Sequence, residues 1–230
     1  MSATIHRTPR SVSRYAVRRA LAIAAISLFI LAAPDSLCAQ TPPAGAPPPA
    51  QPAGRGGGGN ARNRGIRIMT LTSTAFTDGG MIPAKHAQTG RDVSPPLSWT
   101  GAPDSTQSFV LIMHDIDAAI GDGNDDLLHW MAWSIPGATT SLPEGVPQGP
   151  QVMGNMRQIS GTGPYYRGPA APSTGPAHHY MFELYALDIN LNIAAVGMSP
   201  PATRAAVTAA MASHIRGKGV LMGLYKRPAP

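Results

Sequence analysis

The chain has 230 residues, a formal net charge of +6 and a single cysteine, Cys38. The positive charge is concentrated in residues 1–65, which hold eight of the 18 Lys and Arg residues and one of the 12 Asp and Glu residues. Residues 66–230 carry ten basic and eleven acidic residues without an Arg/Lys stripe, which argues against nucleic acid as a partner.

Residues 1–39 predict a secretory signal peptide. Arginines without any acidic residue precede an apolar run from Ala20 to Ala33, which is too short to span a bilayer comfortably. Cleavage is expected after Ala39, which would leave no cysteine and therefore no disulfide or thiolate metal site. We expect an exported protein, periplasmic or extracellular, with no transmembrane segment in the mature chain.

Two alternatives for this leader stay open. The Arg18-Arg19 pair leaves the twin-arginine route as an alternative to Sec export, and Cys38 leaves lipidation as an alternative to simple cleavage. Residues 40–65 are rich in Pro and Gly and have almost no side chain that could be buried, which predicts a disordered linker. One folded domain is expected over residues 66–230.

Short apolar or alternating runs separated by turn residues follow in this domain, which predicts strands over 66–72, 108–114, 129–135, 180–187 and 219–225. One helix is expected near the C-terminus: Ser199 and two prolines can start it, and Gly217 can stop it. Val207, Met211 and Ile215 would share one face of that helix. Many strands with few helices predict a mainly β fold, an antiparallel two-sheet β-sandwich with a few peripheral helices.

Two carboxylates, Asp115 and Asp117, end the second predicted strand. Strand periodicity sends both to one side of the sheet and His114 and Ile116 to the other. Carboxylates at the end of an apolar strand need hydrogen-bond donors, a cation or solvent. The alternatives are a shared site or two solvated turn caps, and the composition of the strand end does not separate them.

Histidines begin the third and fourth predicted strands. His129 precedes a strongly apolar run, where a histidine is more often structural than a ligand. His178 and His179 follow a loop rich in Gly and Pro, and adjacent residues on a strand face opposite sides. At most one of these two is therefore expected to join a common site, and Tyr180 alternates back to the side of His178.

These segments together resemble the phosphatidylethanolamine-binding protein family, and more closely its bacterial branch described as Raf kinase inhibitor-like. The family's D-P-D-A-P motif is matched in part by residues 115–119, its strand histidine by His129, and its Gly-rich second motif by residues 166–172. The His-Arg-Tyr start of the next strand is matched by residues 178–180. The resemblance extends in order from about Met69 to Tyr225.

The resemblance implies a β-sandwich with a shallow pocket at one end that binds phosphate-like anions. Carried over by position, the ligand-binding residues would be Asp115, Asp117, His129, Gly168, Pro169, His178 and Tyr180. The sequence departs from the family motifs at several positions, since Ile116 and Ala119 replace prolines, Ala171 replaces a proline, and His179 replaces an arginine.

Three functions remain open at this point. The first is a non-enzymatic protein that binds a small anion or a phospholipid headgroup, with no cofactor. The second is a hydrolase that uses the same residues with a metal ion, held by Asp115, Asp117 and His129, or with a His–Asp pair. The third is a secreted inhibitor or regulator of a protein partner, since the resembled family includes regulators of partner proteins.

Overall fold

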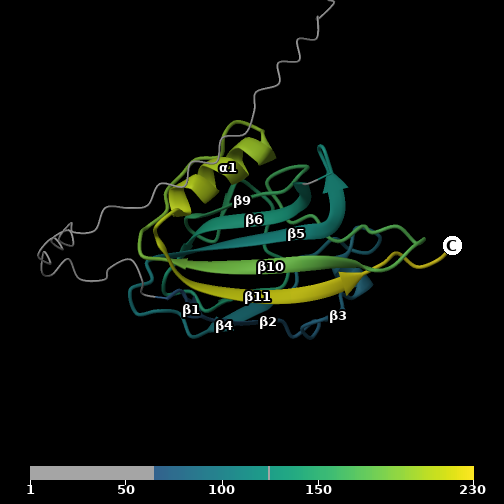
Figure 1. The fold of residues 1–230 in the computed structure, drawn as a ribbon, viewed down its shortest axis with the longest axis horizontal. Coiled ribbons are helices and arrows are strands. Elements are labelled where there is room, and N and C mark those ends of the chain that lie inside the picture. Colours follow the sequence, from purple (N-terminus) through teal and green to yellow (C-terminus); the bar gives the residue numbers. More distant parts are fainter. Residues whose placement is uncertain (1–64, 124) are drawn as a thin grey trace, which may run out of the picture. The chain divides into compact units, whose positions relative to one another are not determined.

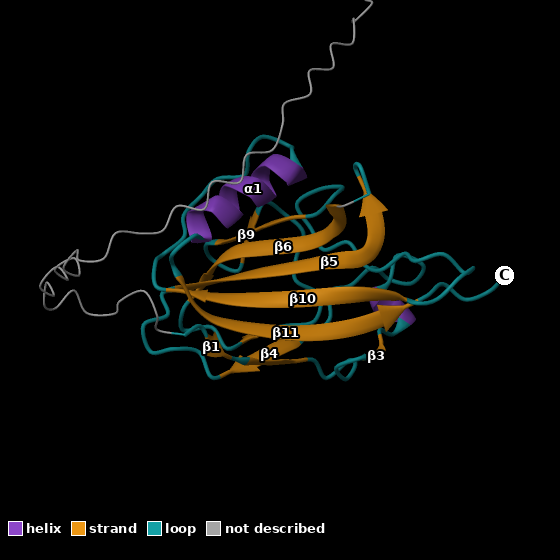
Figure 2. Cartoon of the chain, viewed as in Figure 1, coloured by secondary structure: helices purple, strands orange, loops and turns teal. Residues whose placement is uncertain are grey.

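The computed structural model of the chain describes residues 65–123 and 125–230 (Figure 1). The predicted signal peptide and all but the last residue of the predicted linker lie outside these residues. The described chain is mainly β (Figure 2). Its strands are β1 (Arg67–Ile68), β2 (Thr70–Thr72), β3 (Gly80–Met81), β4 (Leu97–Thr100), β5 (Ser108–Ile120), β6 (Asp125–Pro136), β7 (Ser141–Leu142), β8 (Gln151–Val152), β9 (Met156–Ile159), β10 (His178–Leu187) and β11 (Ile215–Tyr225). The helical elements of the described residues are α1 (Pro200–Met211) and the 3₁₀ turn Ala84–His86.

The strands form two sheets. The main sheet has the order β1-β11-β10-β5-β6-β9-β8, with β3 also paired to β11, and the small sheet has the order β2-β4-β7. The long neighbours β5, β6, β10 and β11 pair antiparallel, whereas the short β1 and β3 run parallel to β11. The predicted mainly β fold with antiparallel pairing of its long strands is therefore confirmed.

One hydrophobic core joins the two sheets. Leu71, Trp99 and Leu142 from the small sheet are buried in the same cluster as Phe109 and Phe182 from the main sheet. The rings of Trp99 and Phe109 meet edge to face with centroids 5.3 Å apart, a favoured aromatic geometry. We call the face of the main sheet that carries this cluster the inner face.

A second core lies on the opposite, outer face of the main sheet. There α1 contributes Val207 and Met211, which pack in one cluster with Val110 of β5 and Met131 and Trp133 of β6. Figure 1 shows α1 lying beside β6 and β9. Because a strand's side chains alternate, consecutive residues of β5 serve the two cores in turn.

The predicted strand over 66–72 is two strands in different sheets. β1 pairs with β11 of the main sheet, and β2 pairs with β4 of the small sheet. Met69 between them is buried, and its backbone N–H donates to the Lys218 carbonyl oxygen over 2.8 Å. The alternating pattern marked extended chain correctly, but an alternation cannot show that the chain crosses from one sheet to the other.

The predicted helix begins where expected and ends earlier. Ser199 caps it, its hydroxyl accepting from the backbone N–H of Ala202 over 3.3 Å. The helix ends at Met211, because Ser213 has a φ of 68° and Ile215 already belongs to β11. The expectation that Ile215 shares the helix face is therefore wrong, while Val207 and Met211 are buried on it.

Among the helices of the described residues, none combines the length and the apolar character needed to cross a bilayer.

Candidate functional site

Asp115 marks the point along β5 where its pairing with β10 ends. This residue is the last of β5 to pair with β10, opposite Tyr180. Its Oδ1 accepts the backbone N–H groups of Asp117 and Ala118, each over 3.1 Å, as in an Asx turn. Beyond this point the ends of β5 and β6 bend away from β10 (Figure 2). Asp115 is itself buried and stands where the pairing of β5 with β10 ends.

Asp115 and His178 form a hydrogen-bonded pair across this end. The Nδ1 of His178 lies 2.9 Å from Oδ2 and 3.1 Å from Oδ1 of Asp115. The carboxylate can only accept, so it fixes the histidine tautomer that carries hydrogen on Nδ1. The Asp115 side chain is 4 % exposed and that of His178 is 22 % exposed. Of this pair, His178 is therefore the more exposed member, and the contacts with Asp115 use only its Nδ1.

Asp117 belongs to a different pair. Its Oδ2 accepts from the backbone N–H of His179 over 2.5 Å and from Nδ1 of the same residue over 2.8 Å. Burial raises the pKa of Asp117, but the hydrogen bonds and charge of His179 outweigh burial, so the pKa is lowered overall. Both side chains are well exposed. The structure therefore places Asp117 at the rim with His179, apart from the Asp115–His178 pair.

His129 occupies a β-bulge in β6. Met113 pairs with Trp130 and the next residue, His114, pairs with Leu128, so His129 is the extra residue between them. Bulges re-aim side chains and are common beside functional sites. Here the Nδ1 of His129 contacts the carbonyl oxygens of Arg167 at 2.9 Å and Gly168 at 3.0 Å. Carbonyl oxygens only accept, so Nδ1 carries the hydrogen.

The second nitrogen of this ring is unsatisfied. The Nε2 of His129 is buried and has no hydrogen-bond partner among the described residues. Burial lowers the pKa of His129, although the loop carbonyls and the Asp115 charge oppose the shift. A neutral ring with hydrogen on Nδ1 leaves a buried lone pair on Nε2. A buried acceptor without a hydrogen bond destabilises the fold unless a ligand or another donor bonds to it.

Tyr180 is buried beneath the candidate site, next to His129. It is fully buried, and its ring meets the His129 ring edge to face with centroids 5.1 Å apart. Its hydroxyl oxygen accepts the backbone N–H groups of Ala170 over 3.1 Å and Ala171 over 3.0 Å. Burial raises the pKa of Tyr180 well above its usual value, and the Asp115 carboxylate adds to the shift. Tyr180 therefore stays a neutral phenol that ties the loop to the sheet.

Gly168 and Pro169 form a buried stretch of the loop that contacts Tyr180. A Cβ on Gly168 would lie 2.1 Å from the carbonyl oxygen of His86, so only glycine fits without movement. The Gly168 N–H donates to Oδ1 of Asp92 over 2.6 Å, and Gln88 donates its backbone N–H to the Pro169 carbonyl oxygen over 3.0 Å. The loop is thereby fixed at both residues that were predicted to form the pocket wall.

Asp92 and Gln88 hold the Gly168 loop in place, and sequence reasoning did not identify either residue. Besides its backbone contact, Gln88 donates from Nε2 to the Gly168 carbonyl oxygen over 2.8 Å. Both lie about eighty positions before the loop that they hold, and no local pattern links the two segments. The only signal at Asp92 is its place before the Val-Ser-Pro-Pro run, which indicates a turn but not what the carboxylate binds.

The assembled group can recognise an anion or serve as a general base. His178 and His129 each have Nδ1 fixed by an acceptor and Nε2 left over. A protonated ring can donate from Nε2 to an anionic oxygen, whereas a neutral ring, which burial favours for His129, can only accept there. Within residues 65–123 and 125–230, no three His, Cys, Asp or Glu side chains are arranged to hold a metal ion. The predicted metal set is not assembled, since Asp117 is engaged by His179 rather than grouped with Asp115 and His129.

Comparison with known proteins identifies the family to which this geometry corresponds. The sequence profile of the family described as "Phosphatidylethanolamine-binding protein" matches residues 72–226. That range includes the Asp115–His178 pair, the His129 bulge and the loop through Gly168.

Several relatives are described as UPF0098 proteins. The chain is 38 % identical over 161 residues to one from Methanothermobacter thermautotrophicus, covering 69 % of this chain and 99 % of the relative. It is 36 % identical over 165 residues to one from Pyrococcus horikoshii, covering 70 % of this chain and 78 % of the relative.

Solved structures show the same fold. A phosphatidylethanolamine-binding protein homologue from Chlamydia trachomatis superposes with a TM-score of 0.58 at 30 % identity, covering 70 % of this chain and 98 % of that one. Escherichia coli YbcL, described as a new member of the mammalian PEBP family, superposes with a TM-score of 0.59 at 21 % identity, covering 69 % and 98 % of the two chains.

Proposed function

Because the chain belongs to the phosphatidylethanolamine-binding protein family, we propose that the Asp115–His178 end of its main sheet binds a phosphate-type anion without transforming it. The phosphate of a phospholipid headgroup is one source of such an anion. We also propose that the protein is exported, since the leader of residues 1–39 has the composition of a secretory signal.

The observation that carries this proposal is the orientation of the two imidazoles. In both rings Nδ1 is held by an acceptor, the Asp115 carboxylate for His178 and the Arg167 and Gly168 carbonyls for His129. Each ring therefore keeps Nε2 for a ligand. A protonated His178 can donate from Nε2 to an anionic oxygen through a charge-assisted hydrogen bond. The neutral form of His129, which burial favours, can instead accept at Nε2 from a protonated oxygen of the same ligand.

The surrounding groups divide into orienting and enclosing roles. Asp115 would repel an anion directly, so its role is to orient His178 by accepting from Nδ1. Asp117 is tied to His179, and both side chains are exposed. Gly168, Pro169 and Tyr180 form a rigid wall and floor, since their backbone or hydroxyl groups are already bonded within the protein.

The proposal is tested by titrating the protein with inorganic phosphate and with phosphoethanolamine while recording histidine and backbone NMR signals. We expect His178 and His129 to shift with millimolar ligand, and His178→Ala to remove the shifts. His214→Ala is the matched control, because His214 forms a similar pair with Asp188, with Nδ1 2.9 Å from Oδ1, away from the site. Unmoved His129 and His178 signals would refute the assignment.

A second candidate function, hydrolysis, is supported by the same Asp115–His178 pair. A carboxylate that orients a histidine is the base half of many nucleophilic sites. Among the described residues, however, the hydrogen bonds of the His178 ring go to Asp115 and not to a Ser or Thr hydroxyl. Hydrolysis of p-nitrophenyl acetate or p-nitrophenyl phosphate that is lost in His178→Ala and kept in His214→Ala would favour the enzyme.

A further inference from the structure

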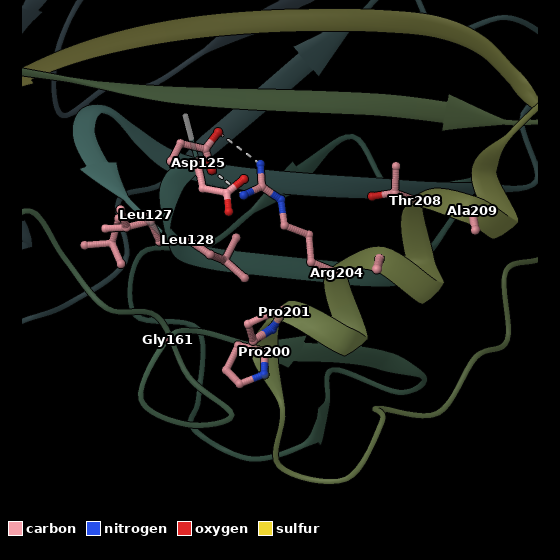
Figure 3. Close-up of a pocket in the computed structure, with 12 residues that line it drawn as sticks. Asp125, Leu127, Leu128, Gly161, Pro200, Pro201, Arg204, Thr208 and Ala209 are labelled. Carbon is pink, nitrogen blue, oxygen red and sulfur yellow. Dashed lines mark hydrogen bonds and ion pairs between the residues drawn. The ribbon is translucent and has the colours of Figure 1, made fainter. Parts of the chain in front are cut away.

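A cavity of about 820 Å³ lies on the outer face of the main sheet, between α1 and the start of β6 (Figure 3). This volume is in the usual range of small-molecule sites. Its wall is mostly apolar: the lining includes Ile120, Leu127, Leu128, Pro200, Pro201 and Ala205. Ile120 remains 42 % exposed at its edge, so apolar surface is open to a ligand there.

The cavity is separate from the proposed anion site. Asp115, which orients His178, lies on the inner side of β5, whereas the preceding residue, His114, faces outward. None of the residues that line the cavity belongs to the Asp115–His178 site. The two sites therefore use different side chains, although Leu127 of the cavity wall pairs with Asp115 through the backbone.

One cationic side chain enters the cavity. Arg204 extends from α1 toward the aspartates at the start of β6 (Figure 3). Its Nη1 and Nη2 donate to the two carboxylate oxygens of Asp126, the second over 3.2 Å. This end-on, two-point contact fixes the plane of the guanidinium group.

Asp126 also contacts a second side chain, His114. Its Oδ2 lies 2.5 Å from Nδ1 of His114, which is buried behind it. Burial lowers the pKa of His114, but its contacts with Glu183 and Asp126 outweigh burial and raise it overall. One carboxylate thus contacts both Arg204 and His114, and Glu183 lies 3.4 Å from the other ring nitrogen of His114.

Arg204 also keeps unused hydrogen-bond capacity. A guanidinium group has five N–H donors, and the contacts with Asp126 use two of them. Its side chain is 29 % exposed. The start of α1 adds no competing donor, because Pro200 and Pro201 have no N–H and the Ala202 N–H is bonded to Ser199. Arg204 is therefore the donor that a ligand in this cavity would meet.

We propose that this cavity is a second ligand site, for a small amphiphile with an aliphatic body and a carboxylate head. The carboxylate accepts from the free edge of the Arg204 guanidinium, and the aliphatic part covers Leu128, Pro201 and Ala205. Asp125 also lines the cavity and would repel a ligand carboxylate, but its side chain is exposed. Solvent therefore screens this repulsion more than it screens the attraction between the carboxylate and the half-buried Arg204.

The test uses octanoate as the probe and the full chain at pH 7.5, with octylammonium as the probe of opposite charge and equal length. We expect octanoate to shift backbone NMR signals of Leu128, Ala205 and Thr208, and to bind about tenfold more tightly than octylammonium. Signals of His178 and Tyr180 should stay in place. Their movement without movement in α1 would overturn the proposal and leave the anion-site proposal untouched.

Two variants test separately the contributions of the cavity space and of the Arg204 charge to octanoate binding. Ala205→Trp fills the cavity from an exposed helix position and should weaken octanoate binding about tenfold or more. Arg204→Met should abolish the preference for octanoate over octylammonium. Arg216→Met is the matched control, since Arg216 pairs with Asp188 away from the cavity, Nη2 to Oδ2 over 2.5 Å.

Either of two results would overturn the proposal whatever the stability of the Arg204 variant. One is octylammonium binding as tightly as octanoate to the natural chain. The other is unchanged octanoate binding in a folded Ala205→Trp variant, shown by its circular dichroism and thermal unfolding.

Discussion

Gly168 is the residue at which the loop wall of the proposed anion site tolerates least change. An added Cβ would meet the His86 carbonyl oxygen at 2.1 Å and the Asp92 Oδ1 at 2.8 Å. Neither neighbour can yield cheaply, because the first is backbone and the second is bonded to the Gly168 N–H. We expect Gly168→Ala to lower the free energy of unfolding by about 1–3 kcal/mol and to weaken phosphate binding by moving His129.

Chemical denaturation and the phosphate titration check this prediction. Gly65→Ala is the control, because a Cβ there would have no neighbour within 4 Å. If Gly168→Ala unfolded at the same denaturant concentration as the natural chain, the loop would be less tightly fixed than its contacts indicate.

His114 makes the stability of the fold depend on pH. It lies between Asp126 of β6 and Glu183 of β10, with Arg204 of α1 on the first carboxylate and Lys218 of β11 on the second. Burial lowers the pKa of His114, but the two carboxylates raise it overall from 6.5. A raised pKa contributes stability below pH 6.5, and this contribution is lost as the pH rises through the folded-state value.

We therefore expect the free energy of unfolding to fall as the pH rises above 6.5, and to fall less steeply in His114→Gln. Urea denaturation measured at several pH values gives both slopes. The same series with His214→Gln controls for the partly exposed His214–Asp188 pair, which should contribute little. Equal slopes for the natural chain and His114→Gln would contradict the prediction.

At the scale of elements, the start of α1 depends on its cap. Ser199 accepts the Ala202 N–H, and no acidic residue in the first turn could replace this contact. We expect Ser199→Ala to lower the free energy of unfolding by about 1 kcal/mol. Ser199→Asp keeps a side-chain acceptor at the cap and should retain most of that stability. A loss in Ser199→Asp as large as in Ser199→Ala would show that the cap contact is not the cause.

Elements were predicted well where local chemistry defines them. The cap and prolines marked the start of α1, and apolar runs marked β5, β6, β10 and β11. The end of α1 was missed because it depends on the positive φ of Ser213, a backbone state that an Ala-rich sequence does not announce. The His129 bulge was missed for a related reason, since only the pairing of β6 with β5 defines it.

The same distinction applies to the sites. Asp115, His129, His178 and Tyr180 could be selected because they begin or end predicted strands and match family motifs. The set of Arg204, Asp126 and His114 could not, since it joins residues of α1, β6 and β5 that meet only after the helix packs on the outer face. Their sequence contexts resemble an ordinary helix surface and a polar turn.

At the scale of the whole molecule, the sheet organises two independent cores and the proposed sites beside them. The inner core connects the main and small sheets, and the outer core lies under α1. Every buried hydrophobic residue of the described chain falls between Met69 and Tyr225. The contacts that hold this fold together thus begin only a few residues after the predicted linker.

This placement predicts the shortest chain that folds. A chain that starts at Gly65 keeps both cores and the pairing of Arg67 and Ile68 with β11, so we expect it to unfold in a single transition with the stability of the full chain. A chain that starts at Ser73 loses β1, β2 and the buried Met69 and Leu71, and leaves parts of β4 and β11 unpaired.

We expect that second truncation to cost about 4 kcal/mol or more, from two buried apolar side chains at about 2 kcal/mol each. Thermal and urea unfolding of the two shortened chains and the full chain measure both effects. If the chain from Gly65 were markedly less stable than the full chain, residues 1–64 would contribute to the folded state. The prediction that the folded domain begins near residue 66 would then be wrong.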